Sequence, residues 1–410
     1  MGSFSIALTG LKANSTALNT IGNNLANMNT TAFKDQTTTF SDLFYQQVGS
    51  SGSGNALEQG LGTRVSSTSS DFTQGTLSTT DNSTDMAIEG NGFFVTTLNG
   101  SEQLTRAGNF QIDNQGNLIT TSGANVMGYA AVNGAVAAGG SLAPLRLPIG
   151  ESQAAQATSN FSLTGNLSSG AAIGAAFSTP VTMYDSLGTS HMATVNFTKT
   201  ASDTWDYSVA LPVGDETGTP MNNTGTLSFD SSGKLVSPTA NVSGINFPGM
   251  ADGAGDLSLS WGLYDGSGNG LLSQTSGATA SSETTQNGFP SGTYNNFTVD
   301  ANGAISASFS NGQTQVVGQV ALANVANEQG LVHVGNNAYV ATQASGAMTI
   351  GKAGAGGLGS IEDQAVESSN VDISTEFTNL IVAQRAFEAN SKTVTTFDTL
   401  TQETINMIHA

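Results

Sequence analysis

The last part of the chain, residues 366–410, constrains the fold more than any other stretch. Apolar side chains recur there at steps of three and four residues, and neither Gly nor Pro follows Asp372. This spacing predicts an amphipathic α-helix of about 40 residues, roughly 60 Å long, with Asp372 as its N-cap. Such a helix carries an apolar stripe, and the stripe needs a partner that shields it from water.

A second helical pattern lies at the opposite end of the chain. Apolar residues spaced by seven occur at Phe4, Leu11, Leu18 and Leu25, and the positions three residues later hold Ala7, Asn14, Ile21 and Met28. Residues 1–34 carry two lysines and no acid, whereas residues 366–410 carry six acids and two bases. Because heptads favour helix packing and opposite charge favours the pairing, we expect the two ends to form a coiled coil.

The N-terminal helix is not expected to be stable alone. Its polar face holds several asparagines, which have low helix propensity because their side chains compete for backbone hydrogen bonds. Helix formation in this segment should therefore depend on neighbours, either in its own chain or in other chains.

Between the two ends the composition predicts β structure. The chain has 50 Gly and only 8 Pro, and apolar residues alternate with polar ones. Three segments, FQIDNQGNL, LSFDSSGKL and FTVDANGAI, lead alternating apolar residues into an Asp and place Gly three positions later; the acids are Asp113, Asp230 and Asp300. These segments predict β-hairpins, because the Asp side chain accepts a backbone N–H and Gly takes a positive φ. A further hairpin is predicted between residues 86–88 and 93–95.

Residues 146–286 differ from the segments on either side. They contain both tryptophans, Trp205 and Trp261, and small-residue stretches flank them, which is typical of an inserted domain. The predicted fold is mainly β, with two β-rich domains, one inserted in the other, and terminal helices that pair as a coiled coil. The predicted parts are a coiled-coil helix (1–34), a linker with extended segments (35–70), a discontinuous β domain (71–145 and 287–361), an inserted outer β domain (146–286) and a second coiled-coil helix (362–410).

The residue types argue against an enzyme and against several partners. There is no Cys, and His191, His333 and His409 lack metal-ligand spacing, so we expect them on the surface or in strands. The adjacent acids Asp215 and Glu216 are expected to be solvated turn residues. The formal charge of −20 opposes binding to nucleic acid or to an anionic membrane. No apolar run approaches 18 residues, so no membrane insertion is expected, and no catalytic, cofactor or metal site is predicted.

Five segments resemble the bacterial flagellar rod and hook axial proteins. ALTGLKANSTALNTIGNNLANMNTTAFK (7–34) and VESSNVDISTEFTNLIVAQRAFEANSK (366–392) resemble the terminal signatures of that family. TDMAIEGNGFFV and LTRAGNFQIDNQGNLIT resemble its β segment, and SFSNGQTQVVGQVALANVANEQGLVHVGNNAYVAT (308–342) resembles the return segment of hook subunits. The resemblance covers about two thirds of the chain and excludes the inserted domain. Within the family, chain length fits the hook subunits best, and distal rod and hook–filament junction subunits are the alternatives.

The resemblance implies a structural subunit that polymerises through its terminal helices into the hook. The hook is a hollow curved tube that acts in motility as a flexible coupling, or universal joint, between motor rod and filament. The implied partners are other copies of the chain, the distal rod, the hook cap, hook–filament junction proteins and the flagellar type III export apparatus. The implied location is extracellular, reached without a cleaved signal peptide. A secreted β-type enzyme acting on polysaccharide and a surface adhesin are the rivals from other classes.

The expected assembly interface lies on the terminal helices. Its predicted residues are Phe4, Leu11, Leu18, Ile21, Leu25, Met28, Ile373, Phe377, Leu380, Ile381, Phe387, Val394 and Phe397. Arg385 is expected either to pair with an acid of a neighbouring subunit or to remain solvated.

Overall fold

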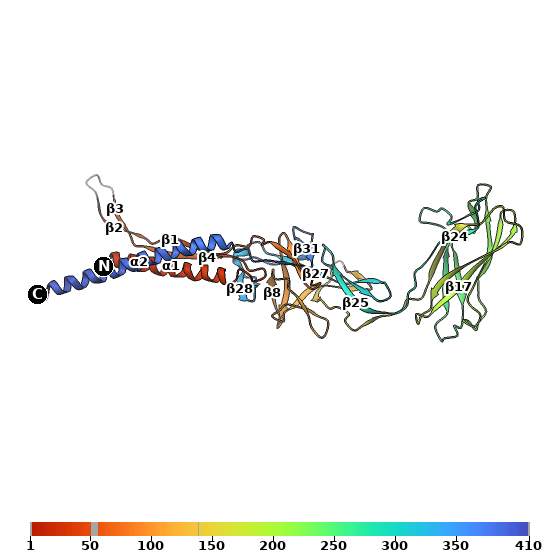
Figure 1. The fold of residues 1–410 in the computed structure, drawn as a ribbon, viewed down its shortest axis with the longest axis horizontal. Coiled ribbons are helices and arrows are strands. Elements are labelled where there is room, and N and C mark those ends of the chain that lie inside the picture. The colour runs from red at the N-terminus through yellow and green to blue at the C-terminus, as the bar shows by residue number, and fades with distance from the viewer. Residues whose placement is uncertain (1, 51–55, 138, 409–410) are drawn as a thin grey trace. The chain divides into compact units, whose positions relative to one another are not determined.

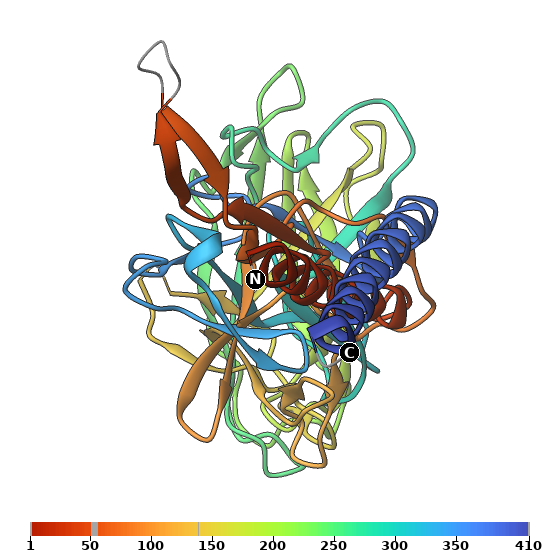
Figure 2. The same ribbon diagram turned by 90° about the vertical axis from the view of Figure 1, so that its left-hand side faces the viewer.

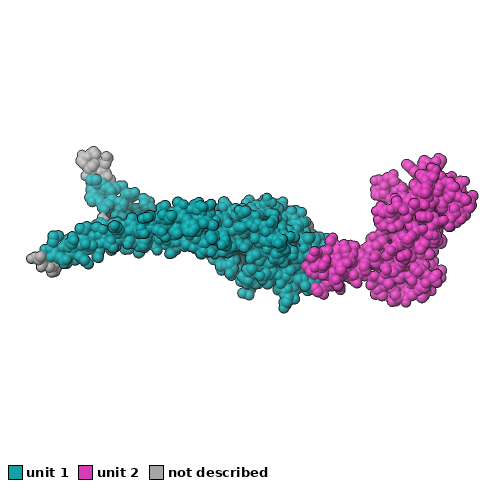
Figure 3. Space-filling view, in the orientation of Figure 1, with its two compact units in different colours: residues 1–149, 297–307, 315–410 teal, residues 150–296, 308–314 magenta. Residues whose placement is uncertain are grey.

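The structure, a computed structural model, describes residues 2–50, 56–137 and 139–408. It divides into two compact units, coloured separately in Figure 3. Unit 1 comprises Met1–Ile149, Phe297–Ala307 and Gln315–Ala410, and unit 2 comprises Gly150–Asn296 and Ser308–Thr314. The predicted boundary at residue 286 is too early, because strand β25 (Gly292–Val299) continues from unit 2 into unit 1 without a turn to mark the change.

Two terminal helices belong to unit 1, which confirms the predicted fold class. They are α1 (Gly2–Ala26) and α2 (Ile373–Ile408). Asp372 caps α2, since its Oδ1 accepts the backbone N–H of Thr375 at 2.7 Å. Both helices are shorter than the predicted 1–34 and 362–410, because backbone pairing of residues 365–367 in a strand precludes helix there, and turns follow Ala26. Met1 and residues 409–410 lie outside the described residues.

In the described parts of the predicted linker with extended segments (35–70), the extended segments form two pairs of strands. Strand β1 (Gln36–Asp42) pairs antiparallel with β4 (Thr63–Ser70), and β2 (Tyr45–Ser50) pairs with β3 (Ala56–Gly60). Thr, Ser and Gln dominate β1 and β4, so the apolar alternation that identifies a strand in sequence is weak here. Helix α1 contacts the β1–β4 pair, where Thr38 Oγ1 and Thr20 Oγ1 form a hydrogen bond of 2.9 Å.

The large sheet of unit 1 is built around two strands that are buried on both faces. Phe93 and Val95 of β7 (Phe93–Leu98) belong to one apolar cluster, and Phe94 belongs to another on the opposite face. Strand β27 (Thr314–Asn324) alternates in the same way, with Leu322 facing one cluster and Ala323 the other. The order is β26-β27-β11-β7-β8-β29-β28.

The other strands of unit 1 are mostly short. They are β5 (Leu77–Thr79), β6 (Met86–Glu89), β8 (Ser101–Thr105), β9 (Gln111–Ile112), β10 (Leu118–Ile119), β11 (Asn125–Val132), β12 (Ala135–Val136), β13 (Leu142–Pro144), β28 (Val332–Gly335), β29 (Ala338–Val340), β30 (Thr349–Lys352), β31 (Ser360–Asp363) and β32 (Ala365–Glu367), with a 3-10 turn η1 (Glu328–Gly330). Strand β26 (Ala304–Phe309) spans the boundary between the units in sequence, as β25 does.

The hairpin predicted between residues 86–88 and 93–95 is wrong. Strand β6 pairs with β31 and β7 pairs with β8, β11 and β27. Gly90 and Gly92 adopt φ of 100° and 120°, so the chain turns a corner between two sheets instead of folding back on itself.

The three predicted Asp–Gly turns are confirmed. In each, the Asp Oδ1 accepts backbone N–H groups two and four residues later, and the Gly between them has a positive φ. Asp185 and Asp265 form the same turn. The identical Asp-x-x-Gly spacing was the signal by which these two could have been found.

Unit 2 contains two sheets that share one apolar core. One sheet has the order β16-β17-β18-β19-β20, and the other has β21-β22-β15-β23 with β24 also paired to β15. Trp205 and Trp261 come from different sheets and are both buried in the shared core. The strands are β14 (Ser152–Gln153), β15 (Asn160–Asn166), β16 (Ala176–Tyr184), β17 (Ser190–Ala201), β18 (Thr204–Ala210), β19 (Thr224–Phe229), β20 (Leu235–Ser237), β21 (Val242–Phe247), β22 (Leu257–Gly262), β23 (Leu272–Ser273) and β24 (Ala280–Gln286).

A buried carboxylate ties the bases of both helices to the β structure of unit 1. Glu367 lies in β32, just before α2, and is fully buried. Its carboxylate accepts hydrogen bonds from Lys34 Nζ at 2.6 Å and from the backbone N–H of Gly75 at 2.8 Å. Arg106 lies 3.5 Å away on the other carboxylate oxygen. Burial lowers the pKa of Lys34, and the negative charge of Glu367 opposes that shift.

We expect Glu367→Gln to destabilise unit 1 by about 3–5 kcal/mol, because it leaves two buried cations without an anionic partner. Urea unfolding of the full chain, followed by ellipticity at 222 nm, reports α1 and α2 and measures this loss. Glu362→Gln, on the exposed side of neighbouring β31, is the control and should change stability by less than about 0.5 kcal/mol. Equal stability of the two variants would contradict the role assigned to Glu367.

Candidate assembly interface

The two terminal helices pack side by side and antiparallel (Figures 1 and 2). Gly10 of α1 lies against Asn390 of α2, and Asn24 Nδ2 donates a hydrogen bond to Glu376 Oε2 at 3.2 Å. A Cβ atom on Gly10 would come within 3.0 Å of the Asn390 side chain, so the backbone approaches closely at this point. Gly10, in the first half of α1, lies against Asn390, whereas Asn24, near the end of α1, contacts Glu376 near the start of α2. The two helices therefore run antiparallel.

Small residues make up much of the buried face of α1, and the predicted heptad leucines are only half-buried. Ala7, Ala13 and Ala17 are almost completely buried, and Ala383 is buried on α2. Small side chains let two helices come close, and the larger side chains are then displaced to the flanks of the contact. Of the positions predicted from spacing by seven, Ala7 and Ile21 are buried, whereas the three leucines are only half-buried.

Most predicted interface residues keep part of their surface free in the single chain. Ile21 is buried. The half-buried ones are Leu11, Leu18, Leu25, Leu380, Phe387, Val394 and Phe397. The exposed ones are Phe4, Met28, Ile373, Phe377 and Ile381.

The exposed residues of α2 form a continuous apolar stripe. Ile373, Phe377 and Ile381 are spaced by four and are 46%, 52% and 57% exposed. Residues four apart lie above one another on a helix, so these three share one side of α2. Helix α2 also runs beyond the start of α1, as Figure 1 shows, and its last turns expose Leu400 and Met407.

The β2–β3 ribbon adds exposed apolar side chains that sequence reasoning missed. Phe44, just before β2, is 88% exposed, and Tyr45, Val48 and Leu57 are each more than half exposed. An isolated two-stranded ribbon is marginally stable in water and rarely carries such side chains without a partner. The available signal was the local cluster of apolar residues on either side of the Gly/Ser stretch, of which residues 51–55 lie outside the described chain.

A groove of about 260 Å³ lies between α1, β1 and α2. Ala17, Ile21, Phe40 and Val382 give it an apolar lining, and Glu376 contributes a buried carboxylate. Nearby, burial and the charge of Glu376 raise the pKa of Asp35 to about 6. The groove can accept an apolar side chain.

Other predicted residues lie elsewhere. Arg385 is 3.9 Å from Glu388 on the exposed surface of α2, so its pairing with a neighbouring subunit stays a prediction. His333 Nε2 lies 3.0 Å from Ser70 Oγ, and His409 is outside the described residues. His191 lies in strand β17, within what the sequence led us to expect, and its imidazole is buried between Asp185 and Asp215. Across the described chain, neither helix has the length and apolar character needed to cross a membrane.

Four family models match the chain. They are "Flagella basal body rod protein" (residues 4–34), "Flagellar hook protein FlgE/F/G D1 domain" (87–158), "Flagellar basal body protein FlaE D2 domain" (170–327) and "Flagellar basal body rod FlgEFG protein C-terminal" (362–407). The second terminal match begins in β31 and includes both Glu367 and α2. These matches confirm the family resemblance at both ends and extend it to unit 2, where sequence reasoning recognised no motif.

Relatives match almost the whole chain. The flagellar hook protein FlgE of Salmonella typhimurium is 35% identical over 99% of this chain and 100% of its own length. FlgE of Escherichia coli is 34% identical over 98% and 99%, and that of Treponema pallidum is 31% identical over 99% of each. The solved Helicobacter pylori FlgE2 shares the fold, with a TM-score of 0.55 and 17% identity over 71% of this chain and 100% of that one. The chain therefore belongs to the flagellar hook protein FlgE family.

Proposed function

We propose that this chain is a structural subunit of the flagellar hook and that copies of it polymerise through their terminal helices into a hollow curved tube. The observation that carries the proposal is the exposed apolar stripe of Ile373, Phe377 and Ile381. Large exposed apolar side chains arranged on one side of a helix mark a contact surface. The relatives that match over their full length are hook proteins, which supports other copies of this chain as the occupants of that surface.

The packing of α1 on α2 within one chain is consistent with a separate role for the exposed apolar side chains in contacts between chains. Gly10 of α1 lies against Asn390 of α2, whereas Ile373, Phe377 and Ile381 of α2 remain exposed in the single chain. Burying a Phe or Ile side chain contributes about 1.5–3 kcal/mol, and a polymer repeats that contribution at every subunit. Polymerisation and folding of the monomer thus use different side chains of the same helices.

The two units suit a flexible coupling in motility. Each unit has its own apolar core, so a change in the contacts made by unit 2 need not disturb the core of unit 1. In this proposal unit 2 is the outer domain of the tube, where small polar contacts between copies tune curvature. No catalytic step is assigned to it.

The same proposal includes the partners and the location. A hook subunit meets the distal rod at one end of the tube and hook–filament junction proteins at the other, with the hook cap and the flagellar type III export apparatus acting during assembly. It works outside the cell, as part of the flagellum. The alternative is a distal rod or junction subunit of the same machine, and the full-length match to hook proteins favours the hook.

Phe377→Asp should prevent polymerisation while leaving the monomer folded. The side chain is 52% exposed, so the change is tolerated in the monomer, whereas a carboxylate without a partner in a packed helical interface costs several kcal/mol. Sedimentation and electron microscopy of the purified protein measure polymer, and circular dichroism measures folding. Thr393→Asp, exposed on the opposite side of α2, is the control and should polymerise more readily than Phe377→Asp. Normal tubes from Phe377→Asp would exclude this stripe from the interface.

Removal of most of unit 2 should leave tube formation intact and change its curvature or stiffness. Gln156 and Phe289 exchange backbone hydrogen bonds of 3.0 and 2.9 Å, so an Asn-Gly turn can replace residues 157–288 and join the two strands directly. The shortened chain would be expressed in cells that lack the hook subunit and imaged by electron microscopy, with the full-length chain as control. The absence of any tube, with the shortened protein exported and its β domain folded, would show that unit 2 is needed for assembly.

A further inference from the structure

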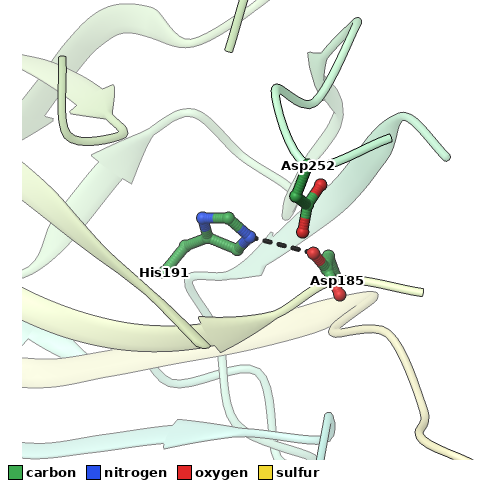
Figure 4. Close-up of side chains that lie close together, drawn as sticks. All are labelled: Asp185, His191 and Asp252. Atoms are coloured by element: carbon green, nitrogen blue, oxygen red, sulfur yellow. Dashed lines mark hydrogen bonds and ion pairs between the residues drawn. The ribbon is translucent and has the colours of Figure 1, made fainter. Parts of the chain in front are cut away.

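Three loops of unit 2 meet at the side chain of His191. This residue is the second of β17 and is 6% exposed. Its Nδ1 lies 2.8 Å from Asp215 Oδ2, and its Nε2 lies 3.0 Å from Asp185 Oδ2. Asp252 comes from a third loop, and Figure 4 shows its carboxylate beside that of Asp185, facing the imidazole.

The number of protons on the imidazole follows from its partners. An ionised carboxylate only accepts hydrogen bonds, and a neutral imidazole has one N–H donor and one lone pair. Two hydrogen bonds to carboxylates, one at each nitrogen, therefore require both nitrogens to be protonated. His191 satisfies its surroundings as an imidazolium cation.

The charges around His191 also favour a cation. Asp185, Asp215 and Asp252 face it from three loops, and Glu216 follows Asp215 with one carboxylate oxygen buried and without a hydrogen-bond partner. Burial and the charge of Asp215 raise the pKa of Glu216. No lysine or arginine of the described chain forms an ion pair with any of these four acids. The imidazolium supplies the positive charge at their centre.

We propose that protonated His191 is a clasp that fastens the loops 185–189, 211–216 and 249–256 of unit 2, and that the clasp opens when rising pH removes its proton. The three loops are distant in sequence and are also joined by the hydrogen bonds from Ala251 N–H to Asp215 O and from Gly255 N–H to Ser186 Oγ, so His191 adds to contacts that hold them together. Two of them expose large apolar residues, Leu187 and Val213, so the clasp also fixes where these side chains are held. This inference concerns unit 2 alone and does not depend on the proposed function.

The direction of the pH effect follows from two pKa shifts. Burial alone would lower the pKa of His191, but the hydrogen bonds and negative charges of Asp215 and Asp185 outweigh it and raise that pKa. A raised pKa of the folded state means that the stabilisation is complete below the unfolded value of about 6.5 and is lost as pH rises through the folded value. Burial opposes ionisation of Asp185, but its hydrogen bonds with His191 and with the backbone N–H groups of Thr189 and Leu187 lower its pKa, so its own contribution is lost only as pH falls through that lowered value.

Urea unfolding followed by tryptophan fluorescence tests the clasp in the full chain, because both tryptophans belong to unit 2. In buffer with a metal chelator, the ratio of unfolded to folded unit 2 should rise with pH above about 6.5, by at most tenfold per pH unit. His191→Gln should abolish this rise, and Asp215→Asn should move it to lower pH. The control His333→Gln, on β28 of unit 1, should leave it unchanged. A rise that persists in His191→Gln, or no rise in the unchanged chain, would overturn the proposal.

The protonation state can also be measured without unfolding. Nitrogen NMR of the unmodified chain, with His191 assigned by comparison with His191→Gln, should show both ring nitrogens protonated at pH 7. A neutral tautomer at pH 7 would overturn the proposal. So would stabilisation of unit 2 by Zn²⁺ at pH 7 that Asp252→Asn removes, because a metal ion rather than a proton would then be the cation that these acids hold.

Discussion

The buried carboxylate of Glu367 is the contact on which the arrangement of unit 1 depends. It joins Lys34 from the segment after α1, Gly75 from the segment before β5, and Arg106 from the segment after β8. A buried charge is held in place by its partners, because any other position leaves an ion in an apolar environment without compensation. The bases of both terminal helices therefore have one defined position on the β structure, and the direction of the helix pair is fixed there.

In the helix pair, small and large apolar residues occupy different positions. Ala7, Ala13, Ala17 and Gly10 are buried on α1, whereas most aromatic and branched residues of the two helices remain half-buried or exposed. A chain that packed its largest residues within its own helix pair would gain stability as a monomer and lose the surface for other copies. Because small residues are buried and large apolar residues are left exposed, a folded monomer can still present an apolar surface to other copies.

Local patterns in the sequence predicted local structure well. The two helices, the Asp372 cap and the Asp–Gly turns all follow from spacing over a few residues, and the motifs at both ends identified the family. The pairing of β6 with β31 joins residues more than 270 positions apart, as in Ile88 with Ile361, and no local pattern encodes it. The polar β1–β4 ribbon lacks apolar alternation, and the His191 cluster draws its acids from separate loops. The spacing of three and four residues identified Phe377 as part of an apolar helix face. That spacing did not predict whether the face is buried within the chain or left exposed.

The pairing of β5 with β32 and of β6 with β31 also has a consequence for the order of folding. Unit 2 is almost contiguous in sequence, whereas unit 1 needs strands from near both ends of the chain before its sheets are complete. Contacts between distant residues form slowly, because a long loop must close first. If the chain folds from its N-terminal end onward, β5 and β6 have unpaired edges until β31 and β32, within about the last 50 residues, can pair with them. A neighbour that covers those edges in the interval would determine whether the chain folds or aggregates.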